Sequence, residues 1–137
     1  MEVRMAEVAD SGQIVRLLRQ LGYDREIGAV EDDVASGAAG SVIVAATEDG
    51  IVGLLTMKIH RQFHWGAVVA SIESLVVAES ERSGGIGAAL VEAAVDIARA
   101  SQCRLIELHS NHRRTQARRF YERQGFEVTS NYFVRQL

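Results

Sequence analysis

SLVVAESERSGGIGAAL, from Ser74 to Leu90, is the stretch from which the rest of the chain is best interpreted. The apolar residues at 75–77 favour a β-strand, and the acidic residues after them end the apolar run. Three glycines within the four positions 84–87 allow backbone conformations that a Cβ would forbid, and a helical pattern begins at Ile86. The stretch therefore predicts a strand, a glycine-rich turn and a helix in immediate succession.

The glycine-rich turn has the features of a phosphate-binding site. A helix that begins directly after such a turn directs free N–H groups and the positive end of its dipole at one position. Arg82 adds a full positive charge there. A nucleotide-triphosphate loop would need Lys and then Ser or Thr after the last glycine, but two alanines follow Gly87. A dinucleotide fingerprint would need Gly or Ala in place of Leu90.

Two motifs resemble one family. RSGGIG at 82–87 resembles the Arg/Gln-x-x-Gly-x-Gly/Ala loop with which the GCN5-related N-acetyltransferases (GNAT) bind the pyrophosphate of acetyl-coenzyme A. RTQARRFYERQGF at 114–126 resembles the Arg/Asn-x-x-Ala-x-x-Phe-Tyr-x-x-x-Gly-Phe motif of the same family. The motifs occur in the family's order, with a predicted strand between them. The histidine-containing stretch before residue 73 and the ending at 129–137 are similar to small-molecule members, notably the aminoalkylphosphonate N-acetyltransferases.

The element pattern agrees with this resemblance. We expect a single α+β domain over residues 1–137 with a GNAT-like fold, in which a central, mostly antiparallel, twisted sheet of six to seven strands has helices on both faces. Gly53 inside a strand indicates a bulge or close backbone packing, and the Asp-Gly turn at 49–50 indicates a hairpin. The predicted strands are 2–8, 41–47, 51–59, 67–77, 104–109 and a closing hairpin at 127–128 and 131–136, and the predicted helices are 11–21, 26–36, 85–100 and 111–124.

Composition restricts the class of protein. The 137 residues carry a formal net charge of −3, so nucleic acid is an unlikely partner. No apolar run approaches membrane-spanning length and no leader pattern opens the chain, so we expect a cytoplasmic protein without a membrane partner. Cys103 is the only cysteine, which excludes an internal disulfide. A homodimer is compatible with the sequence.

The resemblance implies acetyl-coenzyme A (acetyl-CoA) as co-substrate, bound by residues of the strand, the loop and the last helix. Arg114 stands where many members carry Asn, which leaves Asn111 as an alternative for that contact. The implied cofactor-binding residues are Leu75, Val76, Val77, Arg82, Ser83, Gly84, Gly85, Ile86, Gly87, Ala88, Asn111, Arg114, Ala117 and Tyr121.

The resemblance also implies catalytic residues. An amine that attacks a thioester needs a base for its proton, donors for the developing oxyanion and an acid for the leaving thiolate. Glu73 matches the position of a base in several members, Tyr121 that of a general acid, and backbone near Leu75 would donate to the oxyanion. The alternative interpretations are that Tyr121 is a packing residue and that Glu73 is a charge on a solvated face. Alternative bases or substrate contacts are His60, His64 and His109.

The acceptor is expected to be the primary amine of a small polar molecule, attacking directly in a ternary complex. Glu73, His60 and His64 are the candidate substrate residues, and Arg61 beside the histidines favours an anionic far end. An acidic lid of residues 31–33 would instead favour a polycation. The open alternatives are a protein, aminoglycoside or aminoacyl-tRNA amine, or a sensor domain that binds acetyl-CoA without catalysis. The histidine pairs 60/64 and 109/112 lack a third ligand, so no metal site is predicted.

Overall fold

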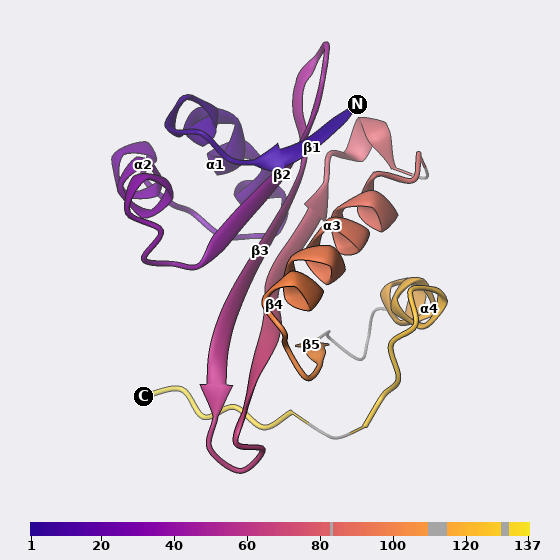
Figure 1. Ribbon diagram of the computed structural model, residues 1–137. Helices are drawn as coiled ribbons and strands as arrows, with labels where there is room; N and C mark the ends of the chain where they lie inside the picture. The colour runs from indigo at the N-terminus through magenta and orange to yellow at the C-terminus, as the bar shows by residue number, and fades with distance from the viewer. Residues whose placement is uncertain (83, 110–114, 130–131) are drawn as a thin grey trace.

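The computed structural model describes residues 1–82, 84–109, 115–129 and 132–137 (Figure 1). None of the helices in these ranges is long and apolar enough to cross a membrane. The strands are β1 (Glu2–Met5), β2 (Ser41–Thr47), β3 (Gly50–Gln62), β4 (Ala67–Val77) and β5 (Ile106–Leu108). The helices are α1 (Ser11–Gln20), α2 (Ile27–Ser36), α3 (Ile86–Ala100) and α4 (Thr115–Arg123), with 3₁₀ turns η1 (Val8–Asp10) and η2 (Glu79–Glu81).

The strands form one sheet in the order β1-β2-β3-β4-β5. The first three pairings are antiparallel, whereas β4 and β5 are parallel because α3 crosses between them. The α+β class is confirmed, but the described residues form a mixed sheet of five strands rather than a mostly antiparallel one of six to seven. The predicted closing hairpin is absent from 127–129 and 132–137. Exposed apolar side chains such as Val128 and Val134 show that no neighbouring face buries this segment as a strand.

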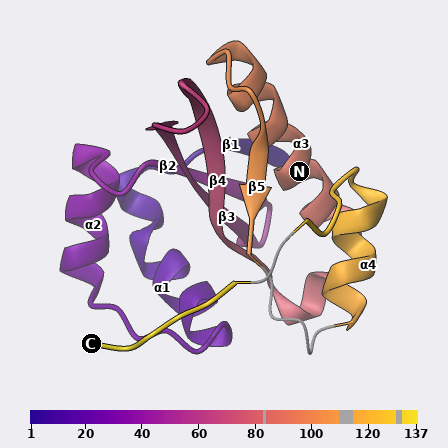
Figure 2. The ribbon, with the colours of Figure 1, turned by 90° about the horizontal axis from the view of Figure 1, so that it is seen from below.

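Helices cover both faces of the sheet, as predicted. Figure 2 shows α1 and α2 on one side of the strands, with α3 and α4 on the other. Side chains alternate across the sheet, so Leu54 packs in the cluster beneath α1 and α2, while its neighbour Leu55 packs in the cluster beneath α3. Both leucines are fully buried. The two apolar cores therefore share the central strand β3.

The β2–β3 hairpin has the predicted turn, with Thr47 opposite Gly50. Opposite Ala45 and Ala46 the register shifts by one residue next to Gly53, which confirms the bulge expected there. A Cβ on Gly53 would lie only 2.9 Å from side-chain atoms of Ile86 and Leu90. Glycine at this position therefore lets α3 lie directly against β3.

The predicted strand 51–59 is too short, because β3 extends to Gln62. Residues 60–62 belong to β3 because they pair with the beginning of β4, where Ala67 lies opposite Gln62. Only 63–66 form the turn. The first strand likewise ends at Met5, before a 3₁₀ turn. His60 is thus a strand residue, opposite Val69.

Candidate active site

A second bulge determines where Glu73 lies. Thr56 of β3 pairs with Ser74, whereas the next residue, Met57, pairs with Ile72, so Glu73 is the extra residue of β4. Ile72 and the residue three positions later, Leu75, both pack in the α3 cluster. Because that spacing leaves two residues between them, Glu73 and Ser74 both lie on the opposite face, beneath α1 and α2.

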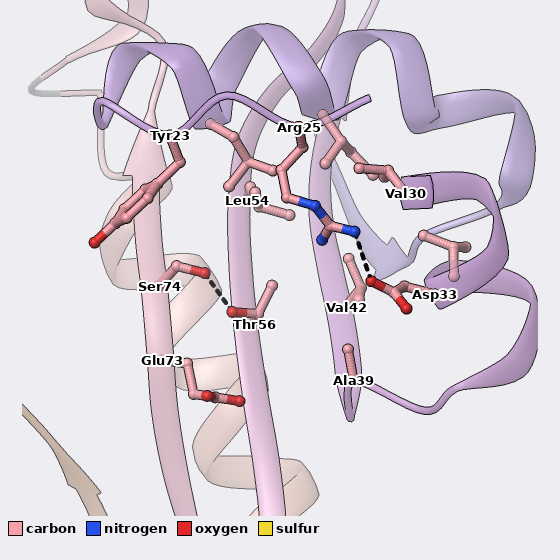
Figure 3. A pocket seen from close by; sticks show the side chains of 13 residues that line it. Tyr23, Arg25, Val30, Asp33, Ala39, Val42, Leu54, Thr56, Glu73 and Ser74 are labelled. Atoms are coloured by element: carbon pink, nitrogen blue, oxygen red, sulfur yellow. Dashed lines mark hydrogen bonds and ion pairs between the residues drawn. The ribbon is translucent and has the colours of Figure 1, made fainter. Parts of the chain in front are cut away.

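Glu73 and Ser74 line a pocket of about 220 Å³ between the sheet and α1–α2 (Figure 3). The other polar lining residues are Thr56 on β3, Tyr23 and Arg25 in the α1–α2 connection, and Asp33 on α2. The rest of the lining is apolar and consists of Ile14, Leu18, Val30, Val34, Ala39, Val42 and Leu54. The pocket is therefore a small apolar cavity with a few polar groups, which is typical of a binding site for a small molecule.

The polar groups of the pocket fall into two sets. On the strands, the hydroxyls of Thr56 and Ser74 are hydrogen-bonded to each other, and the Glu73 side chain lies below them (Figure 3). On the helical side, Arg25 Nη2 donates to Asp33 Oδ2 over 2.9 Å. Among the described residues, the Glu73 carboxylate has no ion-pair or hydrogen-bond partner. Of the three charged residues that line the pocket, Glu73 is thus the one without a charged partner.

The other residues that the sequence assigned to the acceptor, His60 and His64, do not line the pocket. His60 lies four residues beyond Thr56 on β3, about 13 Å along the strand. Its Nδ1 is buried without a hydrogen-bond partner among the described residues. His64 lies in the turn at the tip of the β3–β4 hairpin, and the Arg61 guanidinium donates to the Gly66 carbonyl there. The structure therefore brings neither histidine to Glu73.

His109, the remaining candidate base, stacks on Tyr132 with ring centroids 4.1 Å apart. Within the described ranges, no three side chains of His, Cys, Asp or Glu are grouped closely enough to hold a metal ion. His112 lies outside the described residues.

Beyond the bulge, β4 has an open edge. β5 pairs with β4 only from Ala70 to Ile72. Ala78 N donates to Val52 O over 2.8 Å, so Ala78 is hydrogen-bonded to β3. Hydrogen-bonded and non-hydrogen-bonded positions alternate along an antiparallel pair, and Leu75 and Val77 are therefore not hydrogen-bonded to β3. Their N–H and C=O groups point away from β3, past the end of β5. The groups of Val76, by contrast, point towards β3, and its side chain is buried.

The glycine turn leads from β4 into α3 as predicted. Gly85 caps α3 with φ of +79°, a conformation that residues with a Cβ rarely adopt, and a Cβ there would meet no atom within 4 Å. Gly87 has a different role, because its Cβ would lie 3.2 Å from Phe120 of α4. Arg82 and Gly84 are exposed, whereas the Ile86 side chain is in the core, and Ala88 is half-buried. Ser83 lies outside the described residues.

Tyr121 lies on the buried side of α4. Its ring meets those of Phe120 and Phe126 edge-on, at centroid distances of 5.2 and 5.9 Å. Because Phe120 packs against Gly87, α4 places Tyr121 near the beginning of α3. Ala117 is half-buried on the same face. Asn111 and Arg114 lie outside the described residues.

Several pocket residues were missed in the sequence. Thr56 stands between Leu55 and Met57, and Ser74 precedes the apolar run at 75–77, so this pair of hydroxyls is a signal that could have been used. Tyr23 and Arg25 carry no local signal, because only the return of α2 over the sheet brings them to Glu73. The pocket thus combines residues of α1, α2, β2, β3 and β4 and of the connections between them.

Comparisons with known proteins show the family and the fold. Residues 13–126 match the model of the acetyltransferase (GNAT) family. An aminoalkylphosphonate N-acetyltransferase from Salmonella typhimurium is 26% identical over 140 residues, covering 99% of this chain and 91% of that protein. A transcriptional regulator from Bacillus halodurans C-125 has a similar crystal structure, with TM-score 0.89, 26% identity and 99% of both chains covered. A Trypanosoma brucei acetyltransferase superposes with TM-score 0.86, 27% identity and the same coverage.

Proposed function

The chain belongs to the acetyltransferase (GNAT) family, and we propose that it transfers an acetyl group from acetyl-CoA to a primary amine of a small polar molecule. One observation carries this proposal. The bulge turns the Glu73 carboxylate into a small pocket two residues before Leu75, whose backbone faces the open edge of β4. A base for the amine and hydrogen-bonding groups for an acyl carbonyl thereby lie on adjacent parts of one strand.

The residues present fit acetyl-CoA. The pyrophosphate would lie at the start of α3, where Gly84 and Gly85 keep the helix N-terminus accessible and Arg82 adds positive charge. The pantetheine arm would follow the edge at Leu75 and Val77, where the backbone groups of Leu75 and the N–H of Val77 point away from β3, while the Val77 carbonyl is already bonded to Gln20. Acetyl-CoA would supply an acetyl group activated as a thioester.

In the proposed reaction one side chain accepts a proton and another donates one. Glu73 accepts the proton of the acceptor amine as the nitrogen–carbon bond forms. The Leu75 N–H donates a hydrogen bond to the acetyl oxygen, where negative charge develops. As the carbon–sulfur bond breaks, the Tyr121 hydroxyl donates a proton to the thiolate. The transfer is direct, within a ternary complex, and forms no acetylated enzyme.

The pocket supports a small acceptor. Its volume of about 220 Å³ is below the range of about 300–1,000 Å³ that is usual for sites of drug-sized ligands. An aminoglycoside or a protein segment would extend well beyond it. The similarity to an aminoalkylphosphonate N-acetyltransferase supports a short amine with a polar end as the acceptor.

A second candidate function is binding of acetyl-CoA without transfer. It draws support from the Bacillus halodurans relative, which is described as a transcriptional regulator. The discriminating experiment measures free thiol released from acetyl-CoA in the presence of a panel of short amines, together with the melting temperature in acetyl-CoA alone. Release that depends on an amine supports the transferase. A raised melting temperature without release for any amine supports the binding domain.

A further inference from the structure

We infer that Arg25 binds an anionic group at the far end of the acceptor, in competition with the Asp33 carboxylate with which it is paired in the structure. This inference rests on the proposed function, since it assigns the specificity of the same pocket. It replaces the anion-binding role that the sequence suggested for Arg61 and the histidines of the β3–β4 hairpin.

The charges of the pocket lie on opposite walls. Among the lining residues only Arg25, Asp33 and Glu73 are charged. Figure 3 shows Glu73 on the strand side, and Arg25 reaching from the α1–α2 connection towards Asp33. An acceptor whose amine meets Glu73 therefore has its other end near the helices, where the cation is Arg25. Apart from Tyr23 and the hydrogen-bonded hydroxyls of Thr56 and Ser74, the rest of the lining is apolar, which suits a short methylene spacer.

The Arg25–Asp33 contact leaves the guanidinium accessible. Only Nη2 is engaged, at 2.9 Å from Asp33 Oδ2, and the other guanidinium nitrogens of Arg25 have no partner among the described residues. The side chains are 41% and 35% exposed, so the ion pair is of the weak, solvent-screened kind. A carboxylate or phosphonate can thus accept two hydrogen bonds from the planar fork of Arg25.

Arg61 cannot serve as this anchor in the observed arrangement. Its guanidinium donates to the Gly66 carbonyl at the hairpin tip over 3.0 Å, and Arg61 is not among the pocket residues. The anion specificity therefore belongs to the α1–α2 connection, on the helical wall that faces Glu73.

The test uses steady-state kinetics to compare two amines with the same number of atoms in the main chain: 2-aminoethylphosphonate, which has an anionic far end, and propylamine, whose far end is an uncharged methyl group. Arg25→Gln should lower the preference for the phosphonate, expressed as the ratio of kcat/KM values, by about tenfold to a hundredfold, since a charge-assisted hydrogen bond is lost. Arg25→Lys should restore part of the preference. Asp33→Asn should lower the KM for the phosphonate because a competing anion is removed. Arg16→Gln, an exposed arginine outside the pocket, is the matched control.

Equal effects of Arg25→Gln on both acceptors, or a raised phosphonate KM in Asp33→Asn, would overturn the inference. A second measurement separates this result from failure of the proposed function. 2-Aminoethylphosphonate alone should raise the melting temperature of the wild type and not that of Arg25→Gln. If no amine is acetylated but this shift is present and depends on Arg25, the anion site stands and the transferase proposal fails. If the shift is the same in both proteins, the inference is wrong.

Discussion

The side-chain amide of Gln20 donates a hydrogen bond to the backbone carbonyl of Val77 over 2.7 Å. Its oxygen accepts a second bond from Glu79 N at 3.2 Å. This half-buried residue joins the end of α1 to the point where β4 leaves the sheet. It fixes the chain immediately before the glycine turn and occupies the Val77 carbonyl.

Replacing Gln20 by Met should therefore destabilise the protein. Both hydrogen bonds are lost while the length of the side chain is kept, and we expect the free energy of unfolding to fall by about 1–3 kcal/mol. Urea denaturation measures this change. Arg16→Met, on the exposed side of the same helix, is the control and should change it by less than about 0.5 kcal/mol. Equal midpoints for the two variants would show that water replaces the bonds of Gln20.

Acetyl-CoA should raise the melting temperature, because a ligand of the native state alone stabilises it by linkage. Gly85→Val should abolish most of this shift, since the side chain enters the space in front of α3 and the left-handed cap is strained. Gly66→Val at the tip of the β3–β4 hairpin is the control. It strains the backbone to a comparable extent, since Gly66 has φ of +59° and an open Cβ position, but it lies outside the glycine turn. Calorimetry of both variants with and without acetyl-CoA separates the loss of acetyl-CoA binding from the loss of stability caused by backbone strain. A full shift in Gly85→Val contradicts the loop assignment.

Glu73→Gln should lower kcat by about 10²–10⁴-fold, as expected for loss of a general base. The deficit should shrink at high pH, where the free amine loses its proton without assistance. The fold should be unaffected, because Glu73 is exposed and unpaired within the described part of the chain. Discontinuous assays of thiol release between pH 6 and 10 measure both the fall in kcat and its dependence on pH. A deficit that does not vary with pH would assign Glu73 to substrate binding.

Tyr121→Phe removes the hydroxyl and keeps the ring that packs on Phe120 and Phe126. If the hydroxyl protonates the thiolate, kcat should fall by about 10²–10⁴-fold with little change in the KM for acetyl-CoA. Phe126→Leu is a control for packing, which should affect stability more than turnover. Unchanged turnover in Tyr121→Phe would leave this residue with a packing role alone.

Asp10 should make stability depend on pH. Arg4 donates to both of its carboxylate oxygens, at 2.8 and 3.1 Å, and this hydrogen bonding holds the pKa of Asp10 below its usual value. Because the folded-state pKa is lowered, the stabilisation is complete above the unfolded value of about 3.9 and is lost as pH falls through the folded value. Asp10→Asn should cost about 1–3 kcal/mol at pH 7, measured by denaturation. A difference from wild type that persists undiminished at pH 2 contradicts this account.

Local patterns in the sequence were sufficient for most of the helices and strands. The glycine turn, the Asp-Gly hairpin and the apolar stripes of the helices depend on residues a few positions apart, so they were predicted correctly. The bulge at Gly53 could be predicted as well, because a glycine inside a strand pattern indicates a bulge. The position of Tyr121 on the buried side of α4 also follows from helical spacing.

Tertiary structure alone decided which side chains surround the pocket. Strand alternation does not reveal that β4 holds one residue more than β3 between Ile72 and Ser74, yet this single residue turns Glu73 towards α1 and α2. Gln20 meets Val77 across 57 positions of the chain, and Arg25 reaches the pocket only because α2 returns over the sheet. These contacts depend on strand register and on packing between distant segments, and neither is encoded in the periodicity of any one segment.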